Sequence, residues 1–373
     1  MRKLRIGIDG RAFTSPAAGV RRYVSELVPA LLASDESPDL VALGGAADSV
    51  PTGVQHVAES WHPPTNLGWA VVGLPRAVRR ASVDLIHAPA YTAPLLAAVP
   101  TVLTIHDVSY ERHPEWYPYR RDWLRRAFYR RSARAAAHIL TDSEFSRDEI
   151  AAAYGIARDR ITVAPLGASG TFRETDAAAP VPLPSGIAVP YLLHVGDLHE
   201  RRNLAVVVNA LVEAQRRLET PPLSLVLAGI DRGVGDRLAA MAAGLGAPEA
   251  IIRLGEVSEP TLRALYQNAA ALVYPSRYEG FGLPLVEAMA IGTPVLASRA
   301  ASIPEVVGES GVLLDPGDPR RWADAIVNVM TDSVLRARLR NDGLARAAMF
   351  TWERTARITL AVYQRVAHEA ATH

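Results

Sequence analysis

The sequence predicts an α/β protein made of two similar halves, and three observations support this prediction. Short apolar strands alternate with amphipathic helices along most of the 373 residues. A proline-rich stretch without hydrophobic periodicity interrupts the alternation at residues 177–190. The length suits two domains of ordinary size, each able to bury a core of its own. Strands that alternate with helices predict mostly parallel sheets covered on both faces.

The predicted domains follow from this division. Residues 1–178 form a first Rossmann-like α/β domain, residues 179–190 a linker, residues 191–350 a second α/β domain, and residues 351–373 a final helix. Prolines stiffen the linker.

The predicted strands are short runs of apolar residues. In the first half they span residues 4–9, 40–43, 54–57, 83–87, 101–105, 138–141 and 161–167, and in the second half residues 191–197, 223–228, 251–254, 270–274, 294–297 and 312–314. Helices with an apolar period of 3.6 residues are predicted at residues 20–32, 66–80, 322–330 and 334–349. Ser143 is the expected N-cap of the helix that follows the strand at 138–141.

Composition excludes several classes of function. The net charge of +1 gives no case for nucleic-acid binding, and the absence of cysteine excludes disulfides and thiolate metal sites. Lys3 is the only lysine, so the chain has neither an internal lysine for a pyridoxal phosphate Schiff base nor a Walker A lysine. No apolar run approaches the length of a membrane span, and the apolar start is broken at once by Asp9, Gly10 and Arg11. We therefore expect a cytoplasmic protein without a signal peptide.

A strand, a glycine loop and a helix follow one another at residues 270–290. The apolar run at 270–274 is a buried strand, and Gly280 and Gly282 lie in the loop behind it. Pro284 fits the first turn of the next helix, where a missing N–H costs nothing. Free N–H groups at such a helix N-terminus predict a site for an anion such as a phosphate.

Two glutamates lie on this loop and helix. Glu279 is in the loop and Glu287 is in the helix, with seven residues between them. Two carboxylates at the carboxyl end of one strand can hold the hydroxyls of a sugar and of a ribose. A plainer interpretation is an ordinary strand–helix turn with two solvated glutamates.

The spacing of Glu279 and Glu287, with Gly280, Phe281 and Gly282 between them, resembles the paired-glutamate motif of retaining glycosyltransferases with the GT-B fold. That family includes bacterial mannosyltransferases and the glycosyltransferases of lipopolysaccharide and O-antigen, and the resemblance extends over most of the chain. It implies two Rossmann-like α/β domains whose mostly parallel sheets face a central cleft. The N-terminal domain would bind the acceptor and the C-terminal domain the nucleotide sugar, and the final helix at 351–373 would cross back to the N-terminal domain.

The resemblance also implies which residues bind the donor. Glu279 would hold sugar hydroxyls and Glu287 the ribose diol, while Arg201 and Arg202 would bind the diphosphate. Arg202 stands where the family commonly has lysine, which preserves the charge but changes its geometry. The other implied donor contacts are Gly19, Gly229, Val257, Gly280, Phe281, Gly282 and Leu283. The plainer alternatives are surface arginines that open a helix and glycines that only end a turn.

His106 directly follows the strand at 101–105, at the edge where open α/β sheets bind ligands. A lone histidine is more often structural, but by resemblance His106 would be catalytic and would hydrogen-bond the donor sugar and a phosphate oxygen. His87 and Tyr91, after the preceding strand, would help to shape the acceptor pocket.

Glycosyl transfer must stabilise a diphosphate leaving group and an oxocarbenium-like transition state. Since the chain has no Asp-x-Asp sequence, we expect no metal and no other cofactor, with Arg201, Arg202 and the loop amides in the metal's place. We hypothesise that a donor phosphate oxygen takes the acceptor proton. The predicted donor is GDP-mannose first and a UDP sugar next. The predicted acceptor is a glycan, a polyprenyl-diphosphate-linked molecule or another hydroxyl compound.

Three other hypotheses stay open. A glycosidase-type carboxylate pair is disfavoured, because both glutamates lie on one loop and helix and not on opposing walls. A non-catalytic sugar-nucleotide-binding paralogue would release no nucleotide when an acceptor is added. A nucleotide-sugar 2-epimerase of similar fold would convert its donor without an acceptor.

The segment from Glu111 to Arg134 has the most unusual composition in the chain. It holds four aromatic residues of the Trp and Tyr type in its first part and eight arginines throughout, and we predict a helix with an arginine face. Such a helix could lie on an anionic membrane, grip a diphosphate-linked acceptor, or present an ordinary solvated surface. The first interpretation would make the protein peripheral on the inner face of the membrane.

Overall fold

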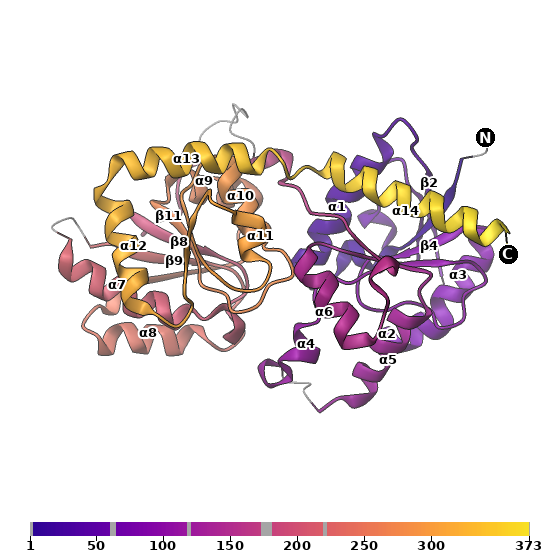
Figure 1. Ribbon diagram of the computed structural model, residues 1–373, viewed down its shortest axis with the longest axis horizontal. Coiled ribbons are helices and arrows are strands. Elements are labelled where there is room, and N and C mark those ends of the chain that lie inside the picture. The colour runs from indigo at the N-terminus through magenta and orange to yellow at the C-terminus, as the bar shows by residue number, and fades with distance from the viewer. Residues whose placement is uncertain (1–2, 60–64, 118–120, 173–180, 219–221, 373) are drawn as a thin grey trace. The chain divides into compact units, whose positions relative to one another are not determined.

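The computed structural model describes residues 3–59, 65–117, 121–172, 181–218 and 222–372. The chain divides into two compact units, Met1–Gly167 with Thr351–His373, and Ala168–Phe350 (Figure 1). The division therefore comes before the boundary predicted after residue 178, because Phe172 is buried against Tyr266 of the second unit. Residues 181–190 form neither helix nor strand, and the linker positions 179–180 lie outside the described residues.

The first unit is built on a seven-stranded parallel sheet in the order β3-β2-β1-β4-β5-β6-β7. Its strands are β1 (Arg5–Asp9), β2 (Asp39–Leu43), β3 (Gln55–Val57), β4 (Leu85–Ala88), β5 (Thr101–Thr104), β6 (His138–Thr141) and β7 (Ile161–Val163). Its helices are α1 (Ala18–Leu32), α2 (Asn66–Gly68), α3 (Leu74–Ala81), α4 (Ser109–Arg112), α5 (Trp123–Ala135), α6 (Glu144–Tyr154) and α14 (Trp352–Thr372). A π-helical segment, Trp69–Gly73, joins α2 to α3. Ser143 caps α6 by accepting from the Ser146 N–H at 3.0 Å, as predicted.

The second unit is built on a six-stranded parallel sheet in the order β10-β9-β8-β11-β12-β13. Its strands are β8 (Tyr191–Val195), β9 (Ser224–Ala228), β10 (Ile251–Gly255), β11 (Ala271–Tyr274), β12 (Val295–Ser298) and β13 (Val312–Leu314). Its helices are α7 (Leu204–Arg217), α8 (Gly235–Gly244), α9 (Glu259–Asn268), α10 (Leu283–Ile291), α11 (Ile303–Val307), α12 (Pro319–Thr331) and α13 (Ser333–Ala347). The two parallel sheets confirm the predicted fold class of two Rossmann-like α/β domains.

Each sheet reverses its strand order at one point. In the second sheet this switch point lies between β8 and β11, which pair in register at Leu192 with Ala271 and at Leu193 with Leu272. Open α/β sheets bind ligands at the carboxyl ends of the strands beside such a point. The loops that leave β8 and β11 there carry Arg202 and Glu279.

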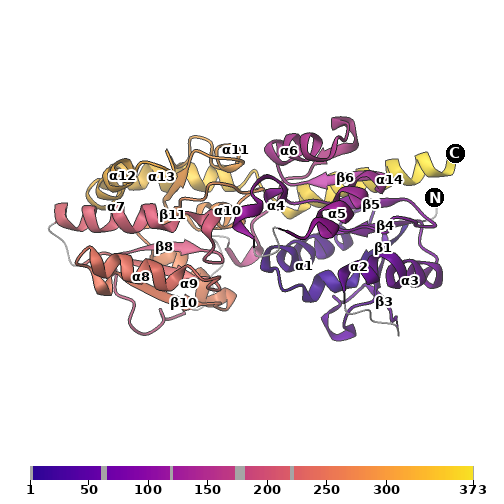
Figure 2. The same cartoon turned by 90° about the horizontal axis from the view of Figure 1, so that it is seen from below.

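Helix α14 belongs to the first unit, where it packs on α1 and β6 (Figures 1 and 2). The hydroxyl of Tyr363 on α14 hydrogen-bonds with Nδ1 of the buried His87 at 2.6 Å, and Nε2 of His87 hydrogen-bonds with the Thr104 hydroxyl at 2.8 Å. Because the ring is buried and both its nitrogens are engaged, His87 connects the sheet to α14. That His87 helps to shape an acceptor pocket stays a prediction.

The segment from Glu111 to Arg134 is not one helix, so the prediction of a helix over this segment is wrong. Helix α4 ends at Arg112, a short 3-10 turn follows at Pro114–Trp116, and α5 begins only at Trp123. Proline in a helix interior removes a hydrogen bond and clashes with the preceding turn, which explains the break. The Asp122 side chain then starts α5 by accepting from the Arg125 N–H at 3.0 Å. Residues 118–120 lie outside the described residues.

Burial of His87 makes the first unit sensitive to acid. Burial, with a smaller contribution from His106, lowers the pKa of His87 to about 3. Below the ordinary histidine pKa of about 6.5, the unfolded chain binds a proton that the native state excludes, so stability present above that pH is lost as the pH falls towards 3. We expect the unfolding free energy of the wild type to fall more steeply than that of His87→Gln, by about 1.4 kcal/mol per pH unit between about pH 6 and 4. Urea denaturation at successive pH values measures the two slopes.

The matched control is His368→Gln, since His368 is an exposed histidine on α14. This variant should keep the wild-type slope. Parallel curves for the wild type and His87→Gln would show that His87 does not carry the acid sensitivity.

Candidate functional site

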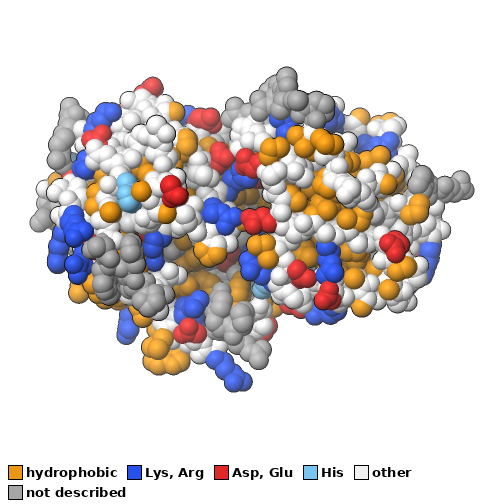
Figure 3. Space-filling view, turned by 180° about the vertical axis from the view of Figure 1, so that it is seen from behind, with side chains coloured by type: hydrophobic (Ala, Val, Ile, Leu, Met, Phe, Trp, Pro, Cys, Tyr) orange, Lys and Arg blue, Asp and Glu red, His pale blue; other side chains and the backbone are white. Residues whose placement is uncertain are grey.

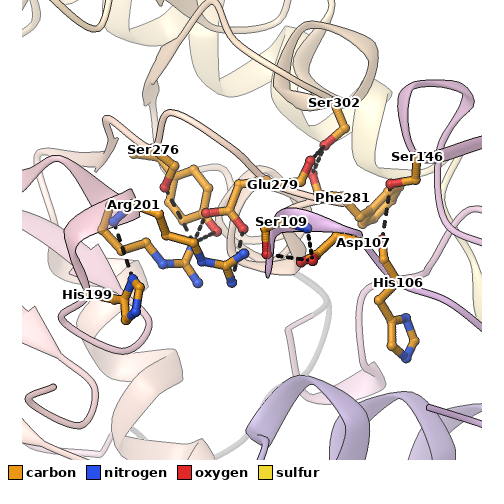
Figure 4. Close-up of polar contacts among 12 residues, drawn as sticks. His106, Asp107, Ser109, Ser146, His199, Arg201, Ser276, Glu279, Phe281 and Ser302 are labelled. Atoms are coloured by element: carbon orange, nitrogen blue, oxygen red, sulfur yellow. Dashed lines mark hydrogen bonds and ion pairs between the residues drawn. The ribbon is translucent and has the colours of Figure 1, made fainter. Parts of the chain in front are cut away.

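The loop between β11 and α10 is buried and firmly held. Gly282, the N-cap of α10, has a φ of +100°, a left-handed conformation that favours glycine. The Ser302 hydroxyl donates to the backbone carbonyls of Glu279 at 2.9 Å and Phe281 at 3.2 Å (Figure 4). These contacts fix the path of the backbone into α10 and hence the direction of its N-terminus.

Arg202 and Glu279 form a buried ion pair at the switch point of the second sheet. Nη1 of Arg202 donates to Glu279 Oε1 and to the Tyr274 hydroxyl, and it lies 3.4 Å from the Ser276 hydroxyl. The side chains of Arg202 and Glu279 are only 11% and 6% exposed. Burial raises the pKa of Tyr274 well above its ordinary value. The Tyr274 hydroxyl therefore stays neutral, and Glu279 supplies the counter-charge.

One donor of the Arg202 guanidinium is unused. Its Nε–H is buried and has no hydrogen-bond partner among the described residues. A buried polar N–H is costly unless it is paired, so an unpaired one needs an explanation. An oxygen atom of a bound anion is a group that would satisfy it.

Arg201 lies beside this pair. Its Nη2 is 3.9 Å from Glu279 Oε2, and Figure 4 shows the two side chains pointing toward each other. Nδ1 of His199 accepts from the Arg201 N–H at 3.3 Å, and the Arg201 carbonyl accepts from the Arg277 N–H at 2.9 Å. The structure thus brings together Arg201, Arg202 and Glu279, which the sequence analysis assigned to one site.

The remaining predicted residues around α10 are mostly buried. Glu287 accepts a hydrogen bond from the Tyr266 hydroxyl at 2.9 Å, and its side chain lies within the unit. Gly280 is buried, and the Phe281 ring packs edge-on against Phe350, with ring centroids 5.6 Å apart. Leu283 is half-buried at the start of α10. The side chain of Phe281 therefore packs in the core, while its backbone forms part of the loop before α10.

Gly229 and Val257 follow β9 and β10, the outer strands of the same half of the sheet. A Cβ atom on Gly229 would lie 2.1 Å from the Gly196 carbonyl oxygen, and the Gly229 N–H donates to the Gly255 carbonyl at 2.8 Å. This close backbone approach explains the glycine without a ligand. Val257 is half-buried in the loop after β10.

In the first unit, His106 pairs with a carboxylate that the sequence analysis missed. Nδ1 of His106 lies 2.8 Å from Asp142 Oδ2, and the Ser146 hydroxyl donates to the His106 carbonyl at 3.0 Å. His106 follows β5 and Asp142 follows β6, the neighbouring parallel strand. The available signal was the position of Asp142 directly after the predicted strand at 138–141.

The pair sets the charge of the imidazole. Burial alone would lower the pKa of His106, but the Asp142 carboxylate, aided by Asp107, raises it above the ordinary value. Nε2 of His106 is buried without a hydrogen-bond partner in the described part of the chain. The ring is thus oriented through Nδ1, and the backbone of Pro89 also contributes to the raised pKa.

Two further predicted residues belong to the first unit. The Tyr91 ring lies edge-on to His106 at a centroid distance of 6.2 Å, so it forms part of the wall around that histidine. Gly19 lies in the first turn of α1, which begins two residues before the helix predicted at 20–32. It is exposed, and no atom lies within 4 Å of the position that a Cβ would take.

The described residues contain no group of three or more His, Cys, Asp or Glu side chains that could hold a metal ion. The charged groups described above are two arginines with one carboxylate in the second unit. The first unit has, separately, a histidine with one carboxylate.

Family comparisons match both halves of the chain. Residues 186–346 match the glycosyl transferases group 1, and residues 17–169 match glycosyltransferase family 4. Over 375 residues the chain is 32% identical to O-antigen chain mannosyltransferase B of Escherichia coli, a match that covers 94% of this chain and 96% of that protein.

Solved structures show the same fold. Sucrose-phosphate synthase from Thermosynechococcus elongatus matches with a TM-score of 0.76 at 21% identity, covering 98% of this chain and 99% of that one. Alr3699/HepE of Anabaena, solved in complex with UDP and glucose, matches with a TM-score of 0.72 at 20% identity, covering 98% of this chain and 100% of that one.

Removing Glu279 should destabilise the second unit, because Arg202 would keep its charge in a buried place without a counter-ion. We expect Glu279→Ala to lower the unfolding free energy by about 3 kcal/mol or more, and the double variant Glu279→Ala with Arg202→Met to recover much of that loss. Urea denaturation of the full chain measures both. Asp236→Ala removes an exposed partner of Arg253 in the same unit and is the control, with little change expected. Equal losses in Glu279→Ala and the double variant would contradict the buried pair.

Proposed function

Because the chain belongs to the group 1 family of glycosyltransferases, we propose that it transfers a hexosyl group from a nucleotide sugar to a hydroxyl acceptor with retention of anomeric configuration. One observation carries the assignment of the donor site. At the switch point of the second sheet, Arg202 is locked to Glu279 and keeps a buried N–H without a partner among the described residues. That the two sheets face a common cleft stays a prediction.

For the donor, we propose GDP-mannose first and a UDP sugar second. The first choice is supported by the Escherichia coli relative, which is an O-antigen chain mannosyltransferase. The second is supported by Alr3699/HepE, a protein of the same fold solved with UDP and glucose. The name of the Escherichia coli relative also supports a glycan chain as the acceptor. A polyprenyl-diphosphate-linked acceptor or another hydroxyl compound stays a prediction.

The diphosphate would bind at Arg201, Arg202 and the N-terminus of α10. Arg202 would use its free Nε–H and Arg201 its half-buried guanidinium, and both are held in place by Glu279. Backbone N–H groups and the positive end of the helix dipole add to the attraction for an anion. Groups already in place need no rearrangement when charge develops on the leaving group, which is how a site of this kind lowers a barrier.

The two glutamates would orient the donor. Glu279, fixed by Arg202, would accept hydrogen bonds from the sugar hydroxyls, and Glu287, held by Tyr266, from the ribose diol. Gly229 and Val257 would contact the base and the ribose, and Gly19 the donor phosphates. The loop residues Gly280, Phe281, Gly282 and Leu283 would contribute backbone groups.

In the reaction, the bond between the anomeric carbon and the donor phosphate oxygen breaks, and the acceptor oxygen forms a new bond on the same face. The acceptor proton passes to the departing phosphate oxygen, which leaves a nucleoside diphosphate. His106 would hydrogen-bond the sugar and a phosphate oxygen through Nε2, since Asp142 holds Nδ1. No protein nucleophile is needed. Two arginines in place of a carboxylate pair support a reaction without metal.

Turnover with sugar nucleotides tests the proposal. We expect GDP-mannose or a UDP sugar to release nucleoside diphosphate only when an acceptor such as octyl α-mannoside is present, with the donor's anomeric configuration kept in the product and with full activity in EDTA. Glu287→Gln should weaken donor binding roughly tenfold through loss of a charged hydrogen bond. Activity followed by nucleotide release, NMR of the product and titration calorimetry give the three readouts.

Glu249→Gln, an exposed carboxylate of the same unit, is the control and should bind the donor as the wild type does. Donor binding without turnover for any acceptor would favour the non-catalytic paralogue, and donor conversion without acceptor the epimerase. Activity lost in EDTA and restored by Mn²⁺ would refute the metal-free mechanism.

The role of Asp142 predicts a change in pH dependence. With asparagine at this position, the carboxylate that raises the pKa of His106 is gone and burial, which lowers it, dominates. The protonated imidazole, which we propose donates to a phosphate oxygen, is then lost at a lower pH. We expect the alkaline limb of kcat/KM for Asp142→Asn to move to lower pH by about one unit or more, while Asp148→Asn, an exposed control on α6, leaves it in place. A uniform loss of activity at every pH would show that Asp142 only supports the fold.

A further inference from the structure

Buried hydrogen bonds connect α14 to α1 through two central strands of the first sheet. The Tyr363 hydroxyl bonds with Nδ1 of His87 at 2.6 Å, and Nε2 of His87 bonds with the Thr104 hydroxyl at 2.8 Å. The Thr104 hydroxyl bonds in turn with the Tyr23 hydroxyl at 3.0 Å. We call these four residues the buried network. They come from α14, β4, β5 and α1, and none of them is more than 2% exposed.

Helix α14 carries Tyr363 into the interior of the first unit. Its buried face includes Trp352, Leu360 and Tyr363, and it packs on α1 and β6. No helix among the described residues, α14 included, has the length and apolarity to cross a membrane. The apolar face of α14 is instead used inside the unit, and it places the Tyr363 hydroxyl beside the sheet.

The buried network consists of neutral groups. Burial, with a smaller contribution from His106, lowers the pKa of His87 to about 3, so the ring carries a single N–H. Burial also raises the pKa of Tyr23 and of Tyr363 well above the ordinary value, so both hydroxyls keep their protons. On the face of the molecule in Figure 3, arginine side chains are prominent and little histidine is visible. Groups that are neutral and buried in this way hold other side chains in place.

The hydrogen bonds of the network depend on one another. Thr104 has one hydroxyl proton and two partners, so it uses this proton only if it donates to one partner and accepts from the other. The bonds then run in a single direction, from Tyr363 to Tyr23 or the reverse. A broken bond leaves a buried polar atom without a partner, which is costly, and it weakens the bonds that remain.

Tyr23, at the α1 end of the network, packs against His106. The ring centroids lie 4.9 Å apart and the ring planes are at 79°, which is an edge-on contact. The ring of Trp352 lies 6.3 Å from that of Tyr23. The hydrogen bond to Thr104 and the contact with Trp352 together fix where the Tyr23 ring lies. A phenylalanine could make the same ring contact with His106, but it could not be tied to Thr104.

This contact supplies what the bond to Asp142 does not. Nδ1 of His106 lies 2.8 Å from Asp142 Oδ2, and a hydrogen bond of this kind still tolerates some tilting of the ring. The edge-on rings of Tyr23, at 4.9 Å, and Tyr91, at 6.2 Å, limit this tilt. Asp142 therefore sets the direction of the imidazole, and its aromatic neighbours set its plane.

We propose that Tyr23 is a positioning residue for His106 and that the buried network, through Tyr363, makes α14 part of the support behind this histidine. The inference rests on the proposed function for the use of His106 in glycosyl transfer, and it goes beyond that function by extending the supporting residues to the last helix of the chain. Tyr23 acts through His106, since its own hydroxyl is bonded to Thr104 inside the unit.

A double-mutant cycle of Tyr23→Phe and Tyr363→Phe tests the network. Each change keeps the ring and removes the hydroxyl at one end of the network. We expect each single variant to lower kcat with GDP-mannose about fivefold through loss of one buried hydrogen bond. The KM for the donor should change little, because the arginines of the second unit would bind the diphosphate. The double variant should lose less than the product of the two single losses, since both changes disrupt the same network.

Tyr191→Phe is the matched control. It removes a buried tyrosine hydroxyl of the second unit, which donates to the Leu265 carbonyl at 2.7 Å. This variant should keep the wild-type kcat, and its combination with Tyr363→Phe should behave as Tyr363→Phe alone. Circular dichroism and urea denaturation check that every variant is folded.

The NMR signal of the His106 ring gives a readout that needs no turnover. The signal is assigned by its absence in His106→Gln. We expect the Hε1 resonance of His106 to shift in Tyr363→Phe, although the ring contact of Tyr363 is with His87, and to stay in place in Tyr191→Phe.

An unchanged His106 resonance in Tyr363→Phe, or kcat losses that multiply in the double variant, would overturn the proposal. A wild type that turned over no donor would refute the proposed function alone, because the His106 resonance would still decide whether the network positions the ring.

Discussion

The buried ion pair between Arg202 and Glu279 is the interaction on which the site of the second unit depends. The two residues come from loops that leave the sheet at β8 and β11, on either side of its switch point. Either charge alone would be costly in this buried position, and together they compensate each other. The pair therefore couples the positions of the two loops. The backbone hydrogen bond from Arg277 to Arg201 and the contacts of Ser302 with the Glu279 loop hold the same arrangement.

In the first unit, His106 and Asp142 are likewise held in place by each other. Both residues directly follow neighbouring parallel strands, β5 and β6, whose register pairs Val102 with His138 and Leu103 with Ile139. The sheet itself thus sets the distance between imidazole and carboxylate. In both units a charged group at the carboxyl end of one strand is oriented by a group at the end of another, and in both a buried nitrogen is left without a partner among the described residues.

The sequence predicted the fold well because its signals are local. Short apolar runs between turns mark most strands, and Gly282 followed by Pro284 marks the start of α10. Contacts between segments that are distant in the chain could not be predicted from the sequence. His87 lies after a strand, like His106, but it bonds with Tyr363, 276 residues later, and only the packing of α14 reveals that it is buried. Asp142 was missed because its partnership with His106 depends on which strands are neighbours. The prediction for the arginine-rich segment at 111–134 was wrong because the composition suggested a single helix, whereas a proline interrupts the helix.

The arginine at position 202, where the resemblance stated above implies a lysine, has a physical reason in this site. A guanidinium is a planar group with five N–H donors, so it can bond with Glu279 and Tyr274 through Nη1 and still present Nε–H elsewhere. An ammonium is a compact point charge on a flexible stem and cannot divide its contacts in this fixed geometry. The wider group also needs space, and Gly196 provides it, because a Cβ there would lie 3.1 Å from Nη2 of Arg202. Arg202 therefore depends on the glycine at 196. A lysine at 202 would hold Glu279 less firmly, even though the net charge stayed the same.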